Sequence, residues 1–236
     1  MTTPSFWLVI PAAGIGSRMQ AQCPKQYLTV AGKTILELTL NCFLEHPGLR
    51  GITVALAEHD RWWPKLQVAE HRLVQTVVGG AERADSVLNA LLALHERGAQ
   101  AHDWVLVHDA ARPLLERDDL DRLLKHLADD PLGGLLAVPA RDTLKQIDAS
   151  GRVMKTIDRR VIWQALTPQM FKLGQLQRTL ADALQAGVAV TDESSAMEWA
   201  GFSPQVVEGR CSNIKITRPE DLLFLQSQLS LRSSSL

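Results

Sequence analysis

The sequence predicts an α/β fold built on a largely parallel sheet flanked by helices. Short apolar runs with the length of buried strands alternate with stretches whose apolar residues recur at helical spacing. The 236 residues can bury one full core, and a hydrophobic fraction of 46% with a charged fraction of 22% is ordinary for a globular protein. We therefore expect one domain over residues 1–236.

The order of the expected elements gives the sheet its direction. Strands are expected at 6–10, 52–56, 73–78, 104–107 and 134–138. Helices are expected at 34–44, 82–97 and 120–127. This alternation is typical of parallel strands joined by crossover helices, and such sheets bind ligands beyond the carboxyl ends of their strands.

One segment breaks the alternation and predicts a β-hairpin arm over about residues 141–161. Residues 143–148 and 152–158 both alternate apolar and polar side chains, and a short loop containing Gly151 joins them. An isolated hairpin is marginal in water, so it must pack on something. It either lies on the sheet of its own chain or reaches across to a second subunit, and the pattern favours neither.

Composition excludes several classes of function. A formal net charge of -1 provides no global basic field, so we expect no nucleic-acid partner. Cys23, Cys42 and Cys211 form neither a metal-binding nor a disulfide pattern, which suits a reducing cytoplasm. The first apolar run, at 6–10, is too short to span a membrane, and no targeting segment is recognisable. We expect a cytoplasmic protein without a membrane partner.

The first candidate motif is the glycine-rich turn at 11–19. Small residues such as Gly14 and Gly16 let backbone N–H groups approach an anion, and the helix start that follows favours negative charge. The spacing is neither that of a Walker loop nor that of a dinucleotide fingerprint. Arg18 and Lys25 lie nearby and suit a triphosphate. The alternative is that Arg18 and Lys25 are two solvated residues on the surface with no ligand.

The second motif, residues 79–87, follows the strand at 73–78. A double glycine ends the strand, and Arg83 and Ser86 open the next helix. Ser86 is a candidate contact for a nucleotide. Its alternative role is a hydrogen bond within the first helical turn.

The third motif, residues 108–113, follows the strand at 104–107. Asp109 lies at the carboxyl edge of the sheet, where a carboxylate can face a metal-bound triphosphate. Arg112 can hold a phosphate through its planar guanidinium. The alternative is an internal ion pair between Asp109 and Arg112. His108 has no apparent His or Cys partner and is interpreted as structural.

The fourth motif surrounds Lys215. Lys215 is expected in a short strand whose apolar neighbours, Ile214 and Ile216, face the opposite side. The lysine then points either to solvent or into a pocket. Thr217 is expected to cap the final helix, with Pro219 in its first turn.

In this order, and together with 141–145, 165–169 and 191–194, the motifs resemble those of the 2-C-methyl-D-erythritol 4-phosphate cytidylyltransferases, enzymes of the non-mevalonate isoprenoid pathway. The resemblance covers nearly the whole chain, and the ordered combination is far more specific than any single motif. Pentitol-phosphate cytidylyltransferases share much of the pattern. The resemblance implies a Rossmann-like nucleotidyltransferase fold.

The resemblance also implies roles for individual residues. Those surrounding the nucleotide would be Pro11, Ala12, Ala13, Gly14, Gly16, Gly80 and Ser86. Those stabilising charge at the reacting phosphates or positioning the attacking phosphate would be Arg18, Lys25, Arg159 and Lys215. Those holding the acceptor would be Asp109, Ala110, Arg112, Thr143 and Thr191. Position 81 is Ala, in a slot that is often polar in the family.

The implied reaction transfers CMP from CTP to 2-C-methyl-D-erythritol 4-phosphate and releases pyrophosphate. Mg²⁺ would be held mainly through the CTP phosphates, with Asp109 as a candidate ligand. The hairpin arm would join a homodimer, and Arg159 would then act in trans. Two alternatives remain: a cytidylyltransferase for another polyol phosphate such as ribitol 5-phosphate, and a non-catalytic nucleotide-binding regulator.

Overall fold

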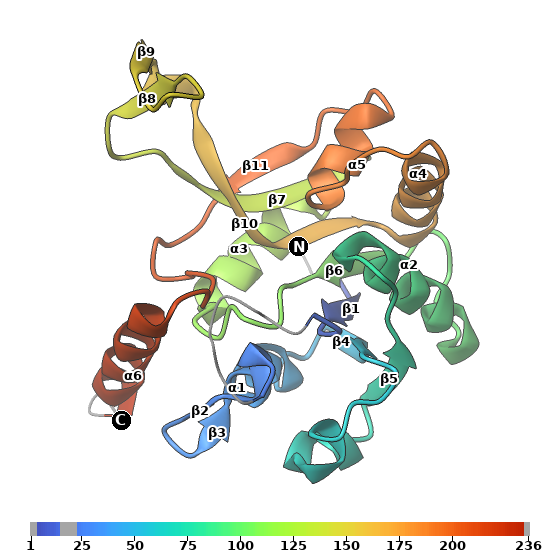
Figure 1. The fold of residues 1–236 in the computed structure, drawn as a ribbon. Coiled ribbons are helices and arrows are strands. Elements are labelled where there is room, and N and C mark those ends of the chain that lie inside the picture. Colours follow the sequence, from blue (N-terminus) through green and yellow to red (C-terminus); the bar gives the residue numbers. More distant parts are fainter. Residues whose placement is uncertain (1–3, 15–22, 234–236) are drawn as a thin grey trace.

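The computed structural model describes residues 4–14 and 23–233, and seven of its strands form one sheet in the order β11-β7-β10-β6-β1-β4-β5 (Figure 1). In that order the strands are Gln205–Glu208, Gly133–Pro139, Trp163–Lys172, Trp104–Val107, Phe6–Pro11, Leu49–Leu56 and Val74–Val78. All neighbouring pairs are parallel except the two made by β10, which runs antiparallel to β6 and β7. The predicted α/β fold with a largely parallel sheet is confirmed.

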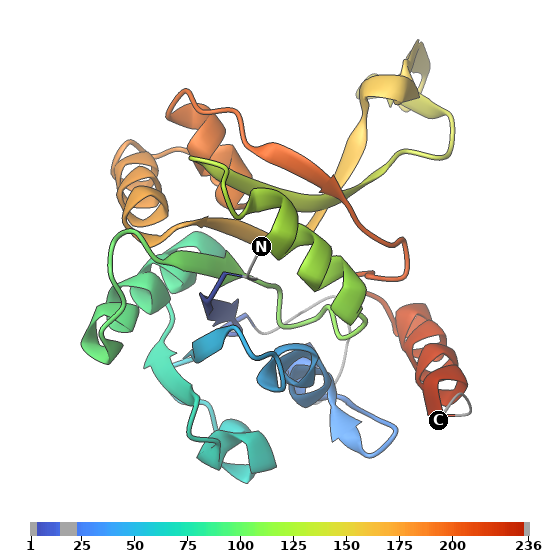
Figure 2. The same ribbon diagram turned by 180° about the vertical axis from the view of Figure 1, so that it is seen from behind.

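Helices cover both faces of this sheet (Figures 1 and 2). Leu8 and Ile10 of β1 pack into one core with α1 and α3, and Trp7 and Val9 pack into the other core with α2, α4 and α5. A strand buried on both faces needs a continuous apolar run, which is what β1 has. The helices are α1 Ile35–Leu44, α2 Arg83–Leu94, α3 Arg117–Leu127, α4 Leu173–Gln185 and α5 Glu193–Trp199.

The last helix, α6 (Pro219–Ser233), covers a third, smaller core beside the short hairpin of β2 (Thr29–Val30) and β3 (Lys33–Thr34). Pro219 opens the helix as expected. The expected cap at Thr217 is wrong, because the helix begins two residues later and the Asp221 side chain accepts the N–H groups of Thr217 and Arg218. Within the described part of the chain, no helix has the length and apolar character needed to cross a bilayer.

The predicted hairpin arm is present and projects from the body of the molecule (Figure 1). β8 (Leu144–Ile147) pairs antiparallel with β9 (Val153–Ile157), and together they form a separate two-stranded sheet. Ile147, Val153 and Met154 are each more than half exposed on it. The arm therefore presents apolar side chains that its own chain leaves uncovered.

Short 3-10 helices complete the described chain: η2 Lys25–Tyr27, η3 Trp63–Lys65, η4 Gln67–Glu70, η5 His95–Arg97 and η6 Arg159–Val161. The parallel strands β5, β1 and β6 all end at one edge of the sheet. The segments that follow them carry the first three sequence motifs. The fold thus brings these motifs together at the carboxyl edge, as the sequence predicts.

Candidate functional site

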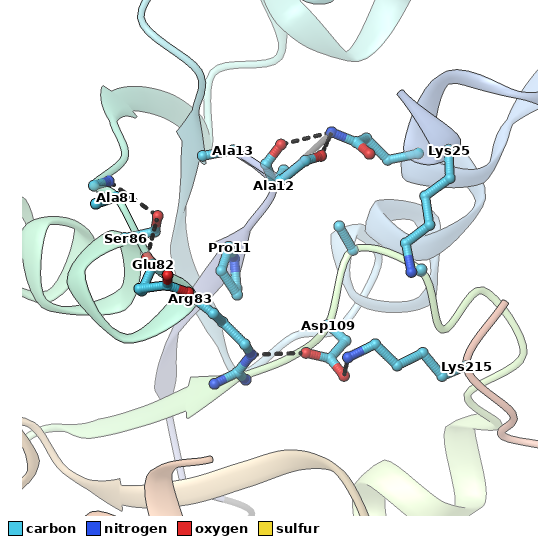
Figure 3. Close-up of a pocket in the computed structure, with 15 residues that line it drawn as sticks. Pro11, Ala12, Ala13, Lys25, Ala81, Glu82, Arg83, Ser86, Asp109 and Lys215 are labelled. Carbon is cyan, nitrogen blue, oxygen red and sulfur yellow. Dashed lines mark hydrogen bonds and ion pairs between the residues drawn. The ribbon is translucent and has the colours of Figure 1, made fainter. Parts of the chain in front are cut away.

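A cavity of about 320 Å³, here called the main pocket, opens at this edge (Figure 3). Its walls come from the segments after β1, β5 and β6, from η2 and from the segment before α6. The residues that line it are Pro11, Ala12, Ala13, Gly14, Lys25, Gln26, Gly80, Ala81, Glu82, Arg83, Ser86, Asp109, Ala110, Ala111 and Lys215. Most of the residues expected from sequence to bind a nucleotide therefore share one cavity.

A second cavity of about 180 Å³, the side pocket, adjoins it. It is lined by Arg83, Asp109, Arg112, Ala165, Leu166, Thr167, Gln169, Thr191, Asp192 and Lys215. Three of these residues, Arg83, Asp109 and Lys215, also line the main pocket, and we call them the shared wall. Arg112 and Thr191, expected to hold an acceptor, lie in the side pocket.

Asp109 stands at the centre of the shared wall, with Arg83 and Lys215 reaching it from opposite sides (Figure 3). Arg83 Nε lies 3.1 Å from Oδ1, Lys215 Nζ lies 3.0 Å from Oδ2, and Arg112 Nε lies 3.5 Å from Oδ2. Burial raises the pKa of Asp109, but the surrounding cations, Arg83 first, outweigh burial and hold the pKa well below its usual range. The carboxylate is therefore ionised at neutral pH and fixes the cations around it.

His108 supports Asp109 from beneath the pocket, and its ring is fully buried. Nε2 lies 3.0 Å from the carbonyl oxygen of Arg112, which can only accept, so Nε2 carries the proton. Nδ1 then accepts from Thr167 Oγ1 at 2.9 Å, and the same hydroxyl oxygen accepts the N–H of Asp109 at 3.1 Å. The interpretation of His108 as structural is confirmed.

This burial predicts a pH dependence of stability. Desolvation lowers the pKa of His108 from 6.5 to about 4. Between these values the unfolded chain binds a proton that the native chain does not, so stability falls as the pH drops from about 6.5 to about 4. The His108 contribution to this loss approaches about 3 kcal/mol. Urea unfolding of the wild type and of His108→Asn at pH 7 and pH 4.5 should give a flatter dependence for the variant; equal slopes would contradict the assignment.

Two close approaches shape the part of the main pocket that the first and second motifs form. The buried Gln26 side chain donates from Nε2 to the carbonyl oxygens of Ala12 at 2.6 Å and Gly14 at 3.1 Å, which fixes the first turn. A Cβ at Gly79 would lie 2.5 Å from Ala13 Cβ and 2.7 Å from Ser86 Oγ. Glycine at position 79 is therefore required for the first and second motifs to pack together.

The Ser86 hydroxyl is engaged within its own loop. It accepts the N–H of Gly80 at 3.0 Å and donates to the carbonyl oxygen of Glu82 at 3.1 Å. These bonds correspond to the alternative role considered for Ser86, although its side chain also lines the main pocket.

Lys25 and Lys215 approach the main pocket from different segments. Lys25 Nζ donates to the carbonyl oxygen of Ile216 at 3.0 Å, so η2 is tied to the segment before α6. The strand expected around Lys215 is wrong, since residues 213–217 have no regular secondary structure. Its orientation is nevertheless the expected one, because Ile214 and Ile216 pack into the third core and Lys215 lines the pocket.

Two of the expected residues that the structure describes line neither pocket. Thr143 and Arg159 lie at the base of the hairpin arm, both exposed, and Arg159 Nη1 donates to the carbonyl oxygen of Arg141. Gly16 and Arg18 lie outside the described residues.

Sequence reasoning gave Glu193, Gln26 and Arg83 no role in the site, although Glu193 lies within the motif at 191–194. Glu193 lies 110 residues from its partner Arg83, so no local pattern connects them. Gln26 directly follows Lys25, but nothing in a single sequence indicates that it holds the first turn. Arg83 belongs to the second motif and is recognisable only as a cation at the start of a helix.

Comparisons with known proteins converge on one family. The family model IspD, 2-C-methyl-D-erythritol 4-phosphate cytidylyltransferase, matches residues 6–231. A protein of that name from Pseudomonas aeruginosa PAO1 is 69% identical over 229 residues, which are 96% of this chain and 98% of that protein. The crystal structure of the Francisella tularensis protein of that name has 39% identity and a TM-score of 0.83, covering 95% of this chain and 99% of the other. The Thermus thermophilus structure has 28% identity and a TM-score of 0.78, covering 94% and 98%. These neighbours confirm the expected Rossmann-like nucleotidyltransferase fold.

Proposed function

Because the chain belongs to the family of 2-C-methyl-D-erythritol 4-phosphate cytidylyltransferases, we propose that the main pocket binds CTP and the side pocket binds the acceptor phosphate. The enzyme transfers CMP from CTP to 2-C-methyl-D-erythritol 4-phosphate and releases pyrophosphate, a step in non-mevalonate isoprenoid precursor synthesis. The observation that carries the assignment of the pockets is the shared wall, where two cavities meet at a cluster of cations.

The reaction needs alignment and positive charge. An oxygen of the acceptor phosphate attacks the α-phosphorus of CTP in line with the departing pyrophosphate, by analogy with phosphoryl transfer. Both reactants are anionic, and two unit charges about 4 Å apart interact by roughly 4 kcal/mol at an effective dielectric of 20. Cations held in place before binding offset this repulsion without reorganising during the reaction. The acceptor phosphate is already a nucleophile near neutral pH, so no general base is needed.

The proposed roles rest on the resemblance to the family, and the pockets that the described residues line support them. Lys25 in the main pocket, with Arg18 from the same motif, would stabilise charge at the reacting phosphate. Lys215 in the shared wall would position the attacking phosphate, and Arg112 and Thr191 would hold the acceptor in the side pocket. The backbone from Pro11 to Gly14 would surround the nucleotide.

We propose Mg²⁺ as the cofactor. No group of three or more His, Cys, Asp or Glu side chains suited to a metal occurs in the residues that the structure describes. Mg²⁺ commonly takes one or two carboxylates together with substrate phosphates and waters. Asp109 fits as one ligand, since its Oδ1 accepts one N–H among the described residues, from Arg83, and so keeps acceptor capacity. The CTP phosphates would supply the others, and the ion would neutralise part of their charge.

A pyrophosphate-release assay tests the function. CTP, Mg²⁺ and 2-C-methyl-D-erythritol 4-phosphate should give turnover that EDTA abolishes and added Mg²⁺ restores, with ribitol 5-phosphate a much poorer acceptor. A preference for ribitol 5-phosphate would reassign the acceptor. CTP binding without pyrophosphate release from any acceptor would indicate a regulator instead.

We also propose a homodimer joined through the hairpin arm, with Arg159 acting in the partner's site. The exposed apolar side chains of the arm and the absence of Arg159 from both described pockets support this. If Arg159 acts in trans, Arg159→Ala and Lys25→Ala subunits mixed under exchange should recover up to about a quarter of wild-type turnover, because half of the subunits would pair as hybrids with one intact site each. Mixing would recover nothing if Arg159 acted in cis.

We further propose that the chain works as one nucleotidyltransferase domain in the cytoplasm. Residues as distant in sequence as Pro11 and Lys215 line the same pocket, which supports a single domain. Three free cysteines support a reducing compartment.

A further inference from the structure

Arg83 joins three segments that are distant in sequence. Its Nη1 and Nη2 lie 2.7 and 3.2 Å from Oε1 and Oε2 of Glu193, and its Nε lies 3.1 Å from Oδ1 of Asp109. The start of α2, the end of β6 and the start of α5 thus meet at one guanidinium. These contacts use three of its five N–H groups and leave two for a ligand.

Arg83 is placed to use those two groups. Its side chain is 26% exposed, and it lines both the main pocket and the side pocket. Glu193, in contrast, is 1% exposed and lines neither pocket, so it has no direct access to a substrate. A buried carboxylate of this kind is tolerated when it is paired, and here both of its oxygens accept from the same guanidinium.

The segment that carries Glu193 is anchored on a second side. Gln169 Nε2 donates to Asp192 Oδ2 at 2.8 Å, and Gln169 Oε1 accepts the N–H of Ser194 at 2.7 Å. The residues on either side of Glu193 are therefore fixed to β10 of the central sheet. Glu193 is a rigid support, and the longer, partly exposed Arg83 side chain is the group whose orientation it decides.

We propose that Glu193 is a positioning residue, which holds the Arg83 guanidinium across the shared wall so that its two remaining N–H groups face the CTP phosphates and the attacking phosphate together. This rests on the proposed function of the two pockets. A fork-shaped cation fixed on both sides by carboxylates contributes positive charge to the junction without having to be ordered during the reaction. Lys215, the other cation of the shared wall, carries a single rotatable ammonium group and offers no such fork.

Steady-state kinetics of Glu193→Gln test the proposal. An amide offers one acceptor oxygen and directs its own N–H groups at the guanidinium, so Arg83 loses its fixed orientation. We expect kcat/KM for the acceptor, at saturating CTP, to fall about 100-fold. Glu198→Gln is the matched control, because Glu198 belongs to the same helix and accepts from Ser194 Oγ outside both pockets. The control should turn over like the wild type, and an equal loss there would overturn the proposal.

A double-mutant cycle separates positioning from structural support. If Glu193 acts only through Arg83, Arg83→Gln with Glu193→Gln should be no slower than Arg83→Gln alone. Losses that multiply in the double variant would overturn the proposal. Should Glu193→Gln fail to fold, Arg83→Lys keeps the charge balance of the cluster but removes the fork, and it should lose a similar factor; normal turnover by Arg83→Lys would overturn the proposal.

Assaying the wild type in parallel distinguishes a failure of the positioning role of Glu193 from a failure of the proposed function. Absence of turnover in the wild type refutes the proposed function and this inference with it. Normal turnover by both the wild type and Glu193→Gln refutes the positioning role alone.

Discussion

Lys25→Ala should lower kcat by about 10²- to 10³-fold, the loss typical when one preorganised charge-stabilising donor is removed. Lys25 lines the main pocket from η2 and donates to the carbonyl oxygen of Ile216, so its ammonium group is held at the pocket that we propose for the triphosphate. A cation that acts on charge developing during transfer changes kcat more than KM. Pyrophosphate release at saturating CTP and acceptor measures the effect.

The stability of Lys25→Ala should stay close to that of the wild type, because the side chain lies at the pocket surface. Thermal unfolding followed by circular dichroism checks this. Lys33→Ala, at the exposed first residue of β3, is the matched lysine control and should retain full activity. Normal turnover by Lys25→Ala would refute its catalytic role.

Asp109→Asn should reduce the free energy of unfolding by about 3–5 kcal/mol, the cost of removing one partner from a buried ionic cluster. Without the carboxylate, Arg83, Lys215 and Arg112 face one another, and among the described residues Glu193 is the remaining carboxylate paired with this cluster. Pyrophosphate should recover part of the loss, because an anion that binds only the native state at this cluster stabilises it. Urea unfolding with and without pyrophosphate measures both effects.

Asp118→Asn provides the control for this substitution. Asp118 also pairs with an arginine, Arg210, but its side chain is 74% exposed, and such surface pairs contribute about 0–1 kcal/mol. An Asp109→Asn protein as stable as the control would show that the shared wall does not depend on its carboxylate.

The parts of the fold that could be predicted are those where local pattern and tertiary environment agree. β1 is buried on both faces, so its apolar run directly indicates a strand. Sequence reasoning does not reveal β10, because Pro168 interrupts it and a proline lacks the N–H that a strand interior needs. The structure accommodates the proline where the register of β10 with β7 shifts, between Ala165 and Gln169.

In the candidate site, too, some residues are predictable from local pattern and others depend on tertiary packing. The positions of Asp109 and Gly80 in the main pocket could be predicted because each lies two residues beyond the end of a strand at the carboxyl edge of the sheet. The pairing of Arg83 with Glu193 depends on how α2 and α5 pack, and no spacing along the chain encodes it. Lys215 shows that alternation alone does not make a strand: Ile216 is buried by packing under α6, while the backbone has no ladder partner.

β10 begins at Trp163 beside the arm and ends at Lys172 within the sheet, and between them it contributes Ala165, Leu166, Thr167 and Gln169 to the side pocket. One strand therefore runs from beside the arm to the side pocket, and it pairs antiparallel with β7. Such a ladder resists bending within its own plane. Contacts that fix the arm would therefore also fix the strand that lines the side pocket, the proposed site of the polyol phosphate.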